Sequence, residues 1–221
     1  MERWVLLRKG ADFEAIGKKY QISPRLACLI RNRDVIGEEA VDRYLNGTIS
    51  DLYDGMLMKD MDKAIDILKE KILEDKKIRV IGDYDIDGVN ATYILLEGLE
   101  RLGADVDSDI PDRISDGYGL NRHLVERAYE AGVDTLITCD NGIAAADEIA
   151  YGKEMGMTVI VTDHHEVPFD EQDGEKRYRI PPADAVMDPK QPDCLYPFKG
   201  LCGAAVAYKL MEALWESMGM D

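Results

Sequence analysis

From residue 78 onward, short apolar runs alternate with longer stretches in which apolar residues recur about every 3.6 positions. The short runs, rich in β-branched residues, are 78–82, 105–109, 135–139 and 158–162. The stretches between them, with helical periodicity, are 89–102, 121–131 and 144–155. Strands that alternate with helices of about 10–15 residues are typical of parallel βαβ units. The pattern therefore predicts an α/β fold, a doubly wound and mainly parallel sheet with flanking helices.

Further elements are expected on both sides of these repeats. Residues 60–75 read as a helix whose apolar side chains share one face that should dock on the sheet. Those side chains are Met61, Ala64, Ile65, Leu68 and Ile72. After the last repeat we expect a long polar loop over 166–183, a short strand over 185–187 and an amphipathic helix over 203–218.

The N-terminal 59 residues read as a small helical segment. Short helices are expected over 13–20, 24–33 and 38–45, the second with Ser23 as its N-cap and Pro24 in its first turn. This segment shows no evident chemistry. We therefore divide the chain into a helical segment, 1–59, and an α/β domain, 60–221.

Composition is that of a globular protein. Hydrophobic residues make up 46% and charged residues 32%, and no run approaches the roughly 18 apolar residues of a membrane span. The N-terminus lacks the pattern of a secretory signal. The four cysteines form no CxxC pair, so we expect buried, reduced thiols. These features predict a soluble, cytoplasmic protein without a membrane partner.

The excess of negative charge comes from the α/β part. The net charge is −17, yet residues 1–77 contain 15 basic and 15 acidic residues, so the whole excess lies from residue 78 onward. This distribution argues against a broad basic groove for nucleic acid on this part of the chain. It fits carboxylates neutralised by divalent cations, and it fits equally a solvated acidic surface.

Acidic residues and histidines follow nearly every predicted strand. They are Asp83, Asp85 and Asp87, then Asp109 and Asp112, then Asp140, then Asp163, His164 and His165, then Asp188. Parallel strands bring their carboxyl ends to one edge of the sheet, where ligands bind. Crowded carboxylates repel one another unless cations lie among them. Two metal ions about 3.5–4 Å apart can clamp a phosphoryl group and activate water.

Taken singly, these residues have simpler interpretations. An aspartate between a strand and a helix is commonly an N-cap, which for Asp87 or Asp140 alone is as good an explanation as metal binding. Asp109 and Asp112 alone favour structural roles, and His123 favours a surface or capping role. Two of the three histidines, however, directly follow Asp163 at a strand end, and with Asp85, Asp87 and Asp140 they favour a metal site.

Other phosphate-binding patterns fit less well. The first strand is followed by carboxylates where a dinucleotide fold needs a glycine-rich turn, and there is no P-loop. Asp83-Tyr84-Asp85 could be the Asp-x-Asp of a haloacid dehalogenase, with Asp83 as a phosphorylated nucleophile. That alternative leaves the segment 163–165 unexplained.

In order and spacing, the segments 83–88, 140–142 and 163–165 resemble the first three motifs of the DHH phosphoesterase superfamily. Within it the chain resembles the RecJ-like exonucleases, which degrade single-stranded DNA from 5′ to 3′ in repair and recombination. Flanking segments extend the resemblance from about residue 45 to the end of the chain. They are 57–64, 110–113, 117–121, 188–190 and 201–207.

The resemblance implies one or two Mn²⁺ or Mg²⁺ ions and hydrolysis without a covalent intermediate. The implied ligands are Asp83, Asp85, Asp87, Asp140 and His164, with Asp140 bridging and Asp83 either a ligand or a close neighbour. The implied catalytic residues are His165, which contacts the scissile phosphate, and Asp163, which orients the histidines. The implied substrate-binding residues are Asn141, Arg113 and Gly203.

The chain also departs from the family pattern. Ile86 lies where family members usually have a small residue, and Asn141 lies where they often have Cys or Ser. Ile81 lies where the related pyrophosphatases have a histidine ligand. The family's fourth motif, a further aspartate ligand, has no counterpart before Asp221, so we expect an N-terminal portion or a truncated paralogue that could be inactive alone. Two alternatives stay open: a phosphodiesterase acting on short oligonucleotides or cyclic dinucleotides, and a non-catalytic DHH-like binding module.

Overall fold

The computed structural model describes residues 4–5, 9–112, 114, 117, 119–172 and 174–220. Contacts within the chain separate two compact units, residues 1–52 and residues 53–221. Each unit has its own buried apolar residues.

The first unit consists of short helices. They are α1 (Phe13–Tyr20), α2 (Pro24–Asn32), α3 (Glu38–Asn46) and the 3₁₀ turn η1 (Ile49–Asp51). The hydroxyl of Ser23 accepts a hydrogen bond from the Leu26 amide and caps α2 as predicted. Ala27, Ile30 and Val41 form the small buried centre. The three predicted helices are confirmed to within one residue at each end.

The second unit is built on a five-stranded parallel sheet. Its strands are β1 (Ile78–Ile81), β2 (Val106–Asp109), β3 (Thr135–Cys139), β4 (Thr158–Thr162) and β7 (Ala185–Met187). They lie in the order β2-β1-β3-β4-β7, and every neighbouring pair is parallel. The direction in which strands are added reverses between β1 and β3, and ligands bind outside such a point in sheets of this kind.

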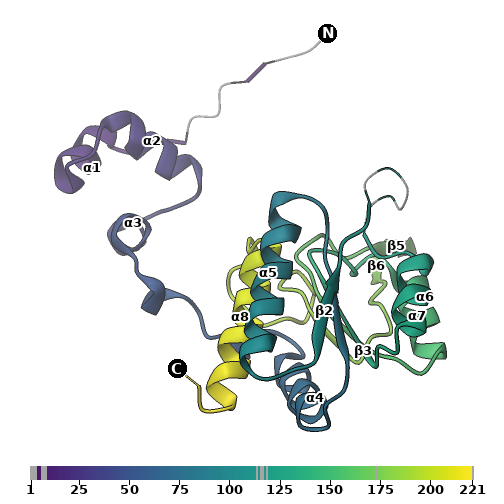
Figure 1. The fold of residues 1–221 in the computed structure, drawn as a ribbon. Coiled ribbons are helices and arrows are strands. Elements are labelled where there is room, and N and C mark those ends of the chain that lie inside the picture. Colours follow the sequence, from purple (N-terminus) through teal and green to yellow (C-terminus); the bar gives the residue numbers. More distant parts are fainter. Residues whose placement is uncertain are drawn as a thin grey trace. The chain divides into compact units, whose positions relative to one another are not determined.

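Helices cover both faces of this sheet (Figure 1). The helices are η2 (Gly55–Leu57), α4 (Met61–Leu73), α5 (Ile86–Arg101) and α8 (Gly203–Ser217) on one face, and α6 (Arg122–Glu130) and α7 (Ala146–Glu154) on the other. Alternate strand residues feed the two cores: Ile137 and Ile160 point to the first, Leu136 and Val159 to the second. The predicted doubly wound α/β fold is confirmed.

The prediction of a long loop over 166–183 is wrong in its middle part. Residues Phe169–Gln172 (β5) and Glu175–Tyr178 (β6) form an antiparallel pair apart from the main sheet. All eight residues are exposed, so no alternation of apolar and polar positions could signal strands. The rings of Phe169 and Tyr178 face each other across the pair, 5.8 Å apart.

Two other expectations need comment. Residues 53–59, assigned to the N-terminal segment from the sequence, belong to the second unit, because Met58 is buried in its core. The division at 59/60 into separate domains stays a prediction. All four cysteines are free thiols. Cys139 and Cys194 are buried as expected, whereas Cys28 is partly buried and Cys202 is exposed, so the expectation of buried thiols is wrong for these two. In the described part of the chain, no helix is long and apolar enough to cross a membrane.

Candidate metal centre

The turn between β1 and α5 carries the first three acids. Asp83 is fully buried and accepts a hydrogen bond from the Tyr84 amide at 2.8 Å. Asp85 is the N-cap of α5, and its Oδ1 accepts from the amides of Asp87 and Gly88 at 2.9 and 3.0 Å. A Cβ on Gly88 would lie 2.6 Å from the carbonyl oxygen of Asp83, so only glycine fits this turn. The turn is therefore fixed by hydrogen bonds within itself.

Asp87 is held from outside the turn by the first residues of α8. Its Oδ2 accepts from the Gly203 amide at 2.7 Å and its Oδ1 from the Ala204 amide at 2.8 Å. Burial alone would raise the pKa of Asp87, but these two backbone donors, together with Cys202 and His164, hold the pKa below its usual range. An ionised carboxylate is also favoured at the N-terminus of a helix.

Asp140 follows β3 in a left-handed backbone conformation, with φ of 60°. Such a conformation costs a non-glycine residue on the order of 1–3 kcal/mol and is concentrated at functional sites. The adjacent Asn141 side chain donates from Nδ2 to the carbonyl oxygens of Ile81 and Cys139, at 3.2 and 3.0 Å. These bonds tie the ends of β1 and β3 together and keep Asp140, which is 1% exposed, in place.

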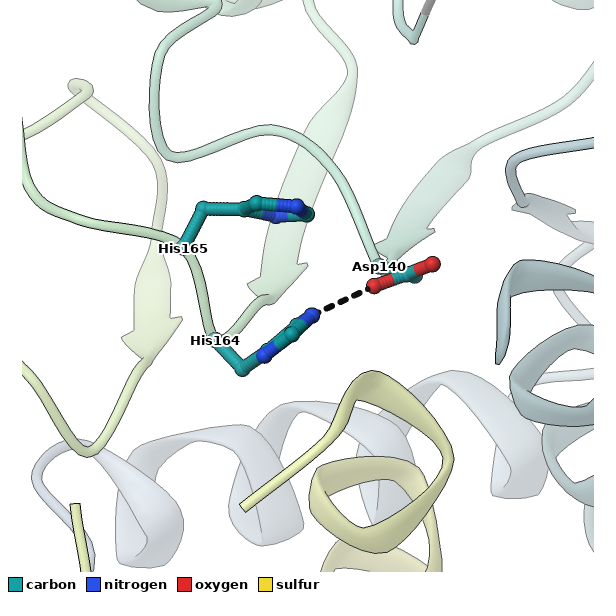
Figure 2. A group of neighbouring side chains, drawn as sticks. All are labelled: Asp140, His164 and His165. Atoms are coloured by element: carbon teal, nitrogen blue, oxygen red, sulfur yellow. Dashed lines mark ion pairs between the residues drawn. The ribbon is translucent and has the colours of Figure 1, made fainter. Parts of the chain in front are cut away.

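Asp163 organises the segment after β4. Its Oδ2 accepts from the Ile143 amide at 2.9 Å, and its Oδ1 accepts from the His164 amide at 2.7 Å. The same Oδ1 lies 2.7 Å from Nδ1 of His165. This hydrogen bond raises the pKa of His165 and directs its Nε2 away from Asp163. In Figure 2 both imidazole rings extend toward Asp140.

His164 faces two carboxylates. Its Nε2 lies 2.9 Å from Oδ1 of Asp140 (Figure 2). The same Nε2 lies 3.5 Å from Oδ2 of Asp87. Burial and the neighbouring His165 lower the pKa of His164, which favours a neutral ring. Apart from this contact with His164, Oδ1 of Asp140 is buried and accepts no hydrogen bond from a residue in the described part of the chain. Two electron-pair donors this close, in a buried position, fit a shared cation.

Electrostatics support the same interpretation. Burial, followed by the charges of Asp87 and Asp85, raises the pKa of Asp140 to about 7. Asp140 also belongs to two groups whose candidate ligand atoms lie within 4.8 Å of one another, one with His164 and His165 and one with Asp83 and Asp85. Carboxylate and imidazole donors suit Mn²⁺, and carboxylates suit Mg²⁺. One carboxylate common to two groups is what a bridging ligand requires.

The predicted substrate-binding residues lie in different surroundings. Gly203 is buried beside the acids. Its amide donates a hydrogen bond to Asp87, and a Cβ on it would lie 2.6 Å from Oδ1 of Asp140. Asn141 is 3% exposed and its amide nitrogen is used within the fold. Arg113 lies outside the described residues. Their contacts with substrate stay predictions.

Other acids at strand ends lie outside this group. Asp109 accepts from Arg127 at 2.7 Å, and Asp112 is exposed and accepts from the Ile114 amide. Asp188 received no role from the sequence, yet it is fully buried after β7, next to β4, and burial raises its pKa to about 7. Its position at the end of a strand was the available signal. The sequence offered none for the two α8 amides that hold Asp87.

Comparison with known proteins agrees with this geometry. RecJ of Bacillus subtilis, a single-stranded-DNA-specific exonuclease, is 40% identical over 96% of this chain and 26% of its own length. A structure of exonuclease RecJ bound to manganese superposes with a TM-score of 0.63 at 38% identity, over 74% of this chain and 39% of that one. The structure of RecJ from Thermus thermophilus in complex with Mn²⁺ superposes with a TM-score of 0.67 at 31% identity, over 99% of this chain and 29% of that one.

The chain thus spans about a quarter to two fifths of the length of these relatives. The profile described as "DHH family, N-terminal domain" matches residues 77–220, which include every strand of the main sheet and all the acids and histidines described above. The chain belongs to the DHH family.

Proposed function

We propose that this chain carries the catalytic centre of a metal-dependent exonuclease that hydrolyses phosphodiester bonds of single-stranded DNA from the 5′ end. The observation that carries the proposal is the position of Asp140 at one edge of the sheet. Asp140 belongs both to a group of candidate ligands with two histidines and to a group with two further aspartates. The names of the RecJ relatives and membership of the DHH family support the choice of substrate. In this proposal residues 60–221 form the DHH domain.

The metal would be held by the acids after β1 and β3 together with one histidine after β4. These residues are Asp83, Asp85, Asp87, Asp140 and His164. When bound, Mn²⁺ or Mg²⁺ would polarise phosphoryl oxygens and lower the pKa of a coordinated water. The buried Oδ1 of Asp140, whose one close polar neighbour among the described residues is His164, and the lowered pKa of His164 both fit this role.

His165 is positioned to contact the substrate phosphate. The hydrogen bond from its Nδ1 to Asp163 raises its pKa, so the ring more readily carries a proton on Nε2. A protonated Nε2 donates a charge-assisted hydrogen bond to a phosphoryl oxygen and stabilises negative charge that develops there. Asp163 fixes the ring and is itself fixed by the Ile143 amide.

The proposal includes a cytoplasmic location, where a DNA substrate would be available. The net charge of −17 supports a second candidate, a short phosphodiester such as an oligoribonucleotide or a cyclic dinucleotide, because a short ligand needs fewer cationic contacts than a DNA strand. Competition separates the two candidates. A cyclic dinucleotide that inhibits DNA hydrolysis at equal concentration would favour the second, and inhibition only by single-stranded DNA would favour the first.

The proposal is tested by incubating the chain with Mn²⁺ and a 5′-phosphorylated single strand labelled at its 3′ end. We expect mononucleotides to be released while the labelled strand shortens from its 5′ end. We expect Asp140→Asn to abolish this release. A duplex of the same sequence serves as the control substrate. Failure to release nucleotides with either Mn²⁺ or Mg²⁺, at enzyme in excess over DNA, by a protein that continues past residue 221 to the length of its RecJ relatives would overturn the proposal.

A further inference from the structure

A cavity of about 320 Å³ lies beside His165, next to the proposed metal ligands. It is open to solvent and is bordered by the segment before α6, the turn after β3 and the first turn of α7. Its lining includes Leu120, Ile143, Ala144, Ala145, Glu148 and His165. Asp163 also borders it, whereas Asp83, Asp85, Asp87 and His164 do not. The cavity is therefore adjacent to the metal centre and distinct from it.

The lining indicates what kind of group would fit. Leu120 and Ile143 are 7% and 1% exposed and, with two alanines, give the cavity an apolar wall. The Asp163 oxygens are already bonded by the amides of the neighbouring backbone and by His165. Besides Oδ1 of Asn141, which accepts no hydrogen bond from the described residues, the acceptor in the lining that is left for a ligand is the carboxylate of Glu148. An anionic phosphate is disfavoured beside it, and a neutral group with hydroxyl or amino donors is favoured.

His165 connects the two places, because its ring lines the cavity and also extends toward Asp140. A phosphate in contact with His165 would carry its sugar and base directly into the cavity. The volume is at the lower end of the roughly 300–1,000 Å³ of small-molecule pockets, which suits one nucleoside better than a longer segment.

We propose that this cavity binds the nucleoside attached to the scissile phosphate, with Glu148 accepting a hydrogen bond from a sugar hydroxyl or a base amino group. Leu120 and Ile143 make apolar contacts with the base or the sugar. This inference rests on the proposed function, because it assumes that His165 contacts the phosphate. It adds a subsite that selects for an intact nucleoside at the cleaved bond.

Substrates that lack one base provide the first test. Single strands with an abasic site at the first or the second nucleotide are compared with the intact strand in Mn²⁺. We expect an abasic site at one of the two positions to lower kcat/KM about tenfold. Equal rates for all three strands would overturn the subsite while leaving the exonuclease proposal standing, and hydrolysis of none of them would count against the exonuclease itself.

Binding without turnover provides an independent test. Calorimetry in Mn²⁺ compares deoxyadenosine monophosphate with deoxyribose 5-phosphate, which has the same phosphate and no base. We expect the nucleotide to bind at least about tenfold more tightly. Equal dissociation constants would overturn the inference whether or not the chain hydrolyses DNA.

Variants locate the binding to the cavity. Glu148→Gln removes the charge with little change of shape and should weaken nucleotide binding about tenfold, while the affinity for Mn²⁺ is unchanged. Ala144→Phe narrows the exposed rim of the cavity and should have at least as large an effect. Ala131→Phe adds the same ring at the exposed end of α6 and is the matched control. Wild-type nucleotide binding by both cavity variants would overturn the proposal.

Discussion

Replacing Gly203 by alanine would place a methyl group inside the candidate metal centre. The added Cβ would lie 2.6 Å from Oδ1, 2.7 Å from Cβ and 2.8 Å from Cγ of Asp140. Carbon atoms do not approach this closely, so either Asp140 or the start of α8 must move. Because the Gly203 amide donates to Asp87 at 2.7 Å, a shift of α8 would displace that acid as well. One methyl group therefore disturbs two of the proposed ligands.

The expected magnitude follows from two opposing effects. Overpacking a buried site costs about 1–3 kcal/mol. Alanine is favoured over glycine within a helix by up to about 1 kcal/mol, although less at the first helical residue. We therefore expect Gly203→Ala to lower the free energy of unfolding of the metal-free protein by about 1–2 kcal/mol. Displaced ligands should weaken Mn²⁺ binding by about 10–100-fold.

Gly152→Ala in α7 is the matched control. A Cβ there would meet its nearest neighbours at 3.5 and 3.6 Å, which is ordinary contact, so stability should be unchanged or slightly increased. Urea unfolding without metal measures the first effect, and calorimetric titration with Mn²⁺ measures the second. If Gly203→Ala matches Gly152→Ala in both measurements, the close packing of α8 against the acids does not control the metal centre.

The remaining predictions concern the histidines and pH. His164→Ala should weaken Mn²⁺ binding tenfold or more, whereas His165→Ala should keep the metal affinity and lower single-turnover hydrolysis about 10²–10⁴-fold; equal losses of metal affinity would contradict these separate roles. Because the pKa of Asp140 is about 7 without metal, the affinity for Mn²⁺ should increase with pH by up to about tenfold per unit below pH 7. Calorimetry in two buffers should detect the proton that is released. An affinity that does not change between pH 5.5 and 8 would contradict this prediction. The pKa of Asp140 is higher in the metal-free fold than its value of 3.8 in the unfolded chain. The resulting stabilisation is fully present at pH values below 3.8 and should be lost as the pH rises through about 7. Urea unfolding at pH 5 and 8 should show a decline that Asp140→Asn reduces, and an unchanged decline would contradict the assignment.

The α/β fold could be predicted because its signals are local. Each strand of the main sheet is a short apolar run, and successive residues serve opposite cores, as Leu136 and Ile137 do. The helix after each strand shows its own periodicity, and parallel strands then allow few connections. The β5–β6 pair could not be found this way, because both strands are exposed and polar and are stabilised mainly by pairing with each other.

The candidate ligands could be predicted for a related reason, since each follows a strand whose end lies at the same edge of the sheet. Their supports could not. The Gly203 and Ala204 amides meet Asp87 across more than 100 residues, and a backbone amide has no sequence signature. The left-handed conformation of Asp140 likewise arises from its packing and is not indicated by its residue type. The sequence therefore indicates which groups could bind a metal, and the tertiary contacts decide how each is held.

These supports give neighbouring acids opposite properties. The α8 amides keep the pKa of Asp87 low, so it stays ionised with or without a metal, whereas burial and the charges of Asp87 and Asp85 raise the pKa of Asp140 to about 7. The metal-free centre thus avoids full charge by protonating one specific carboxyl. A divalent cation reverses that preference, since it stabilises the ionised form of Asp140 beside a neutral His164. Metal binding would therefore be coupled to release of a proton from Asp140, the proposed bridging ligand.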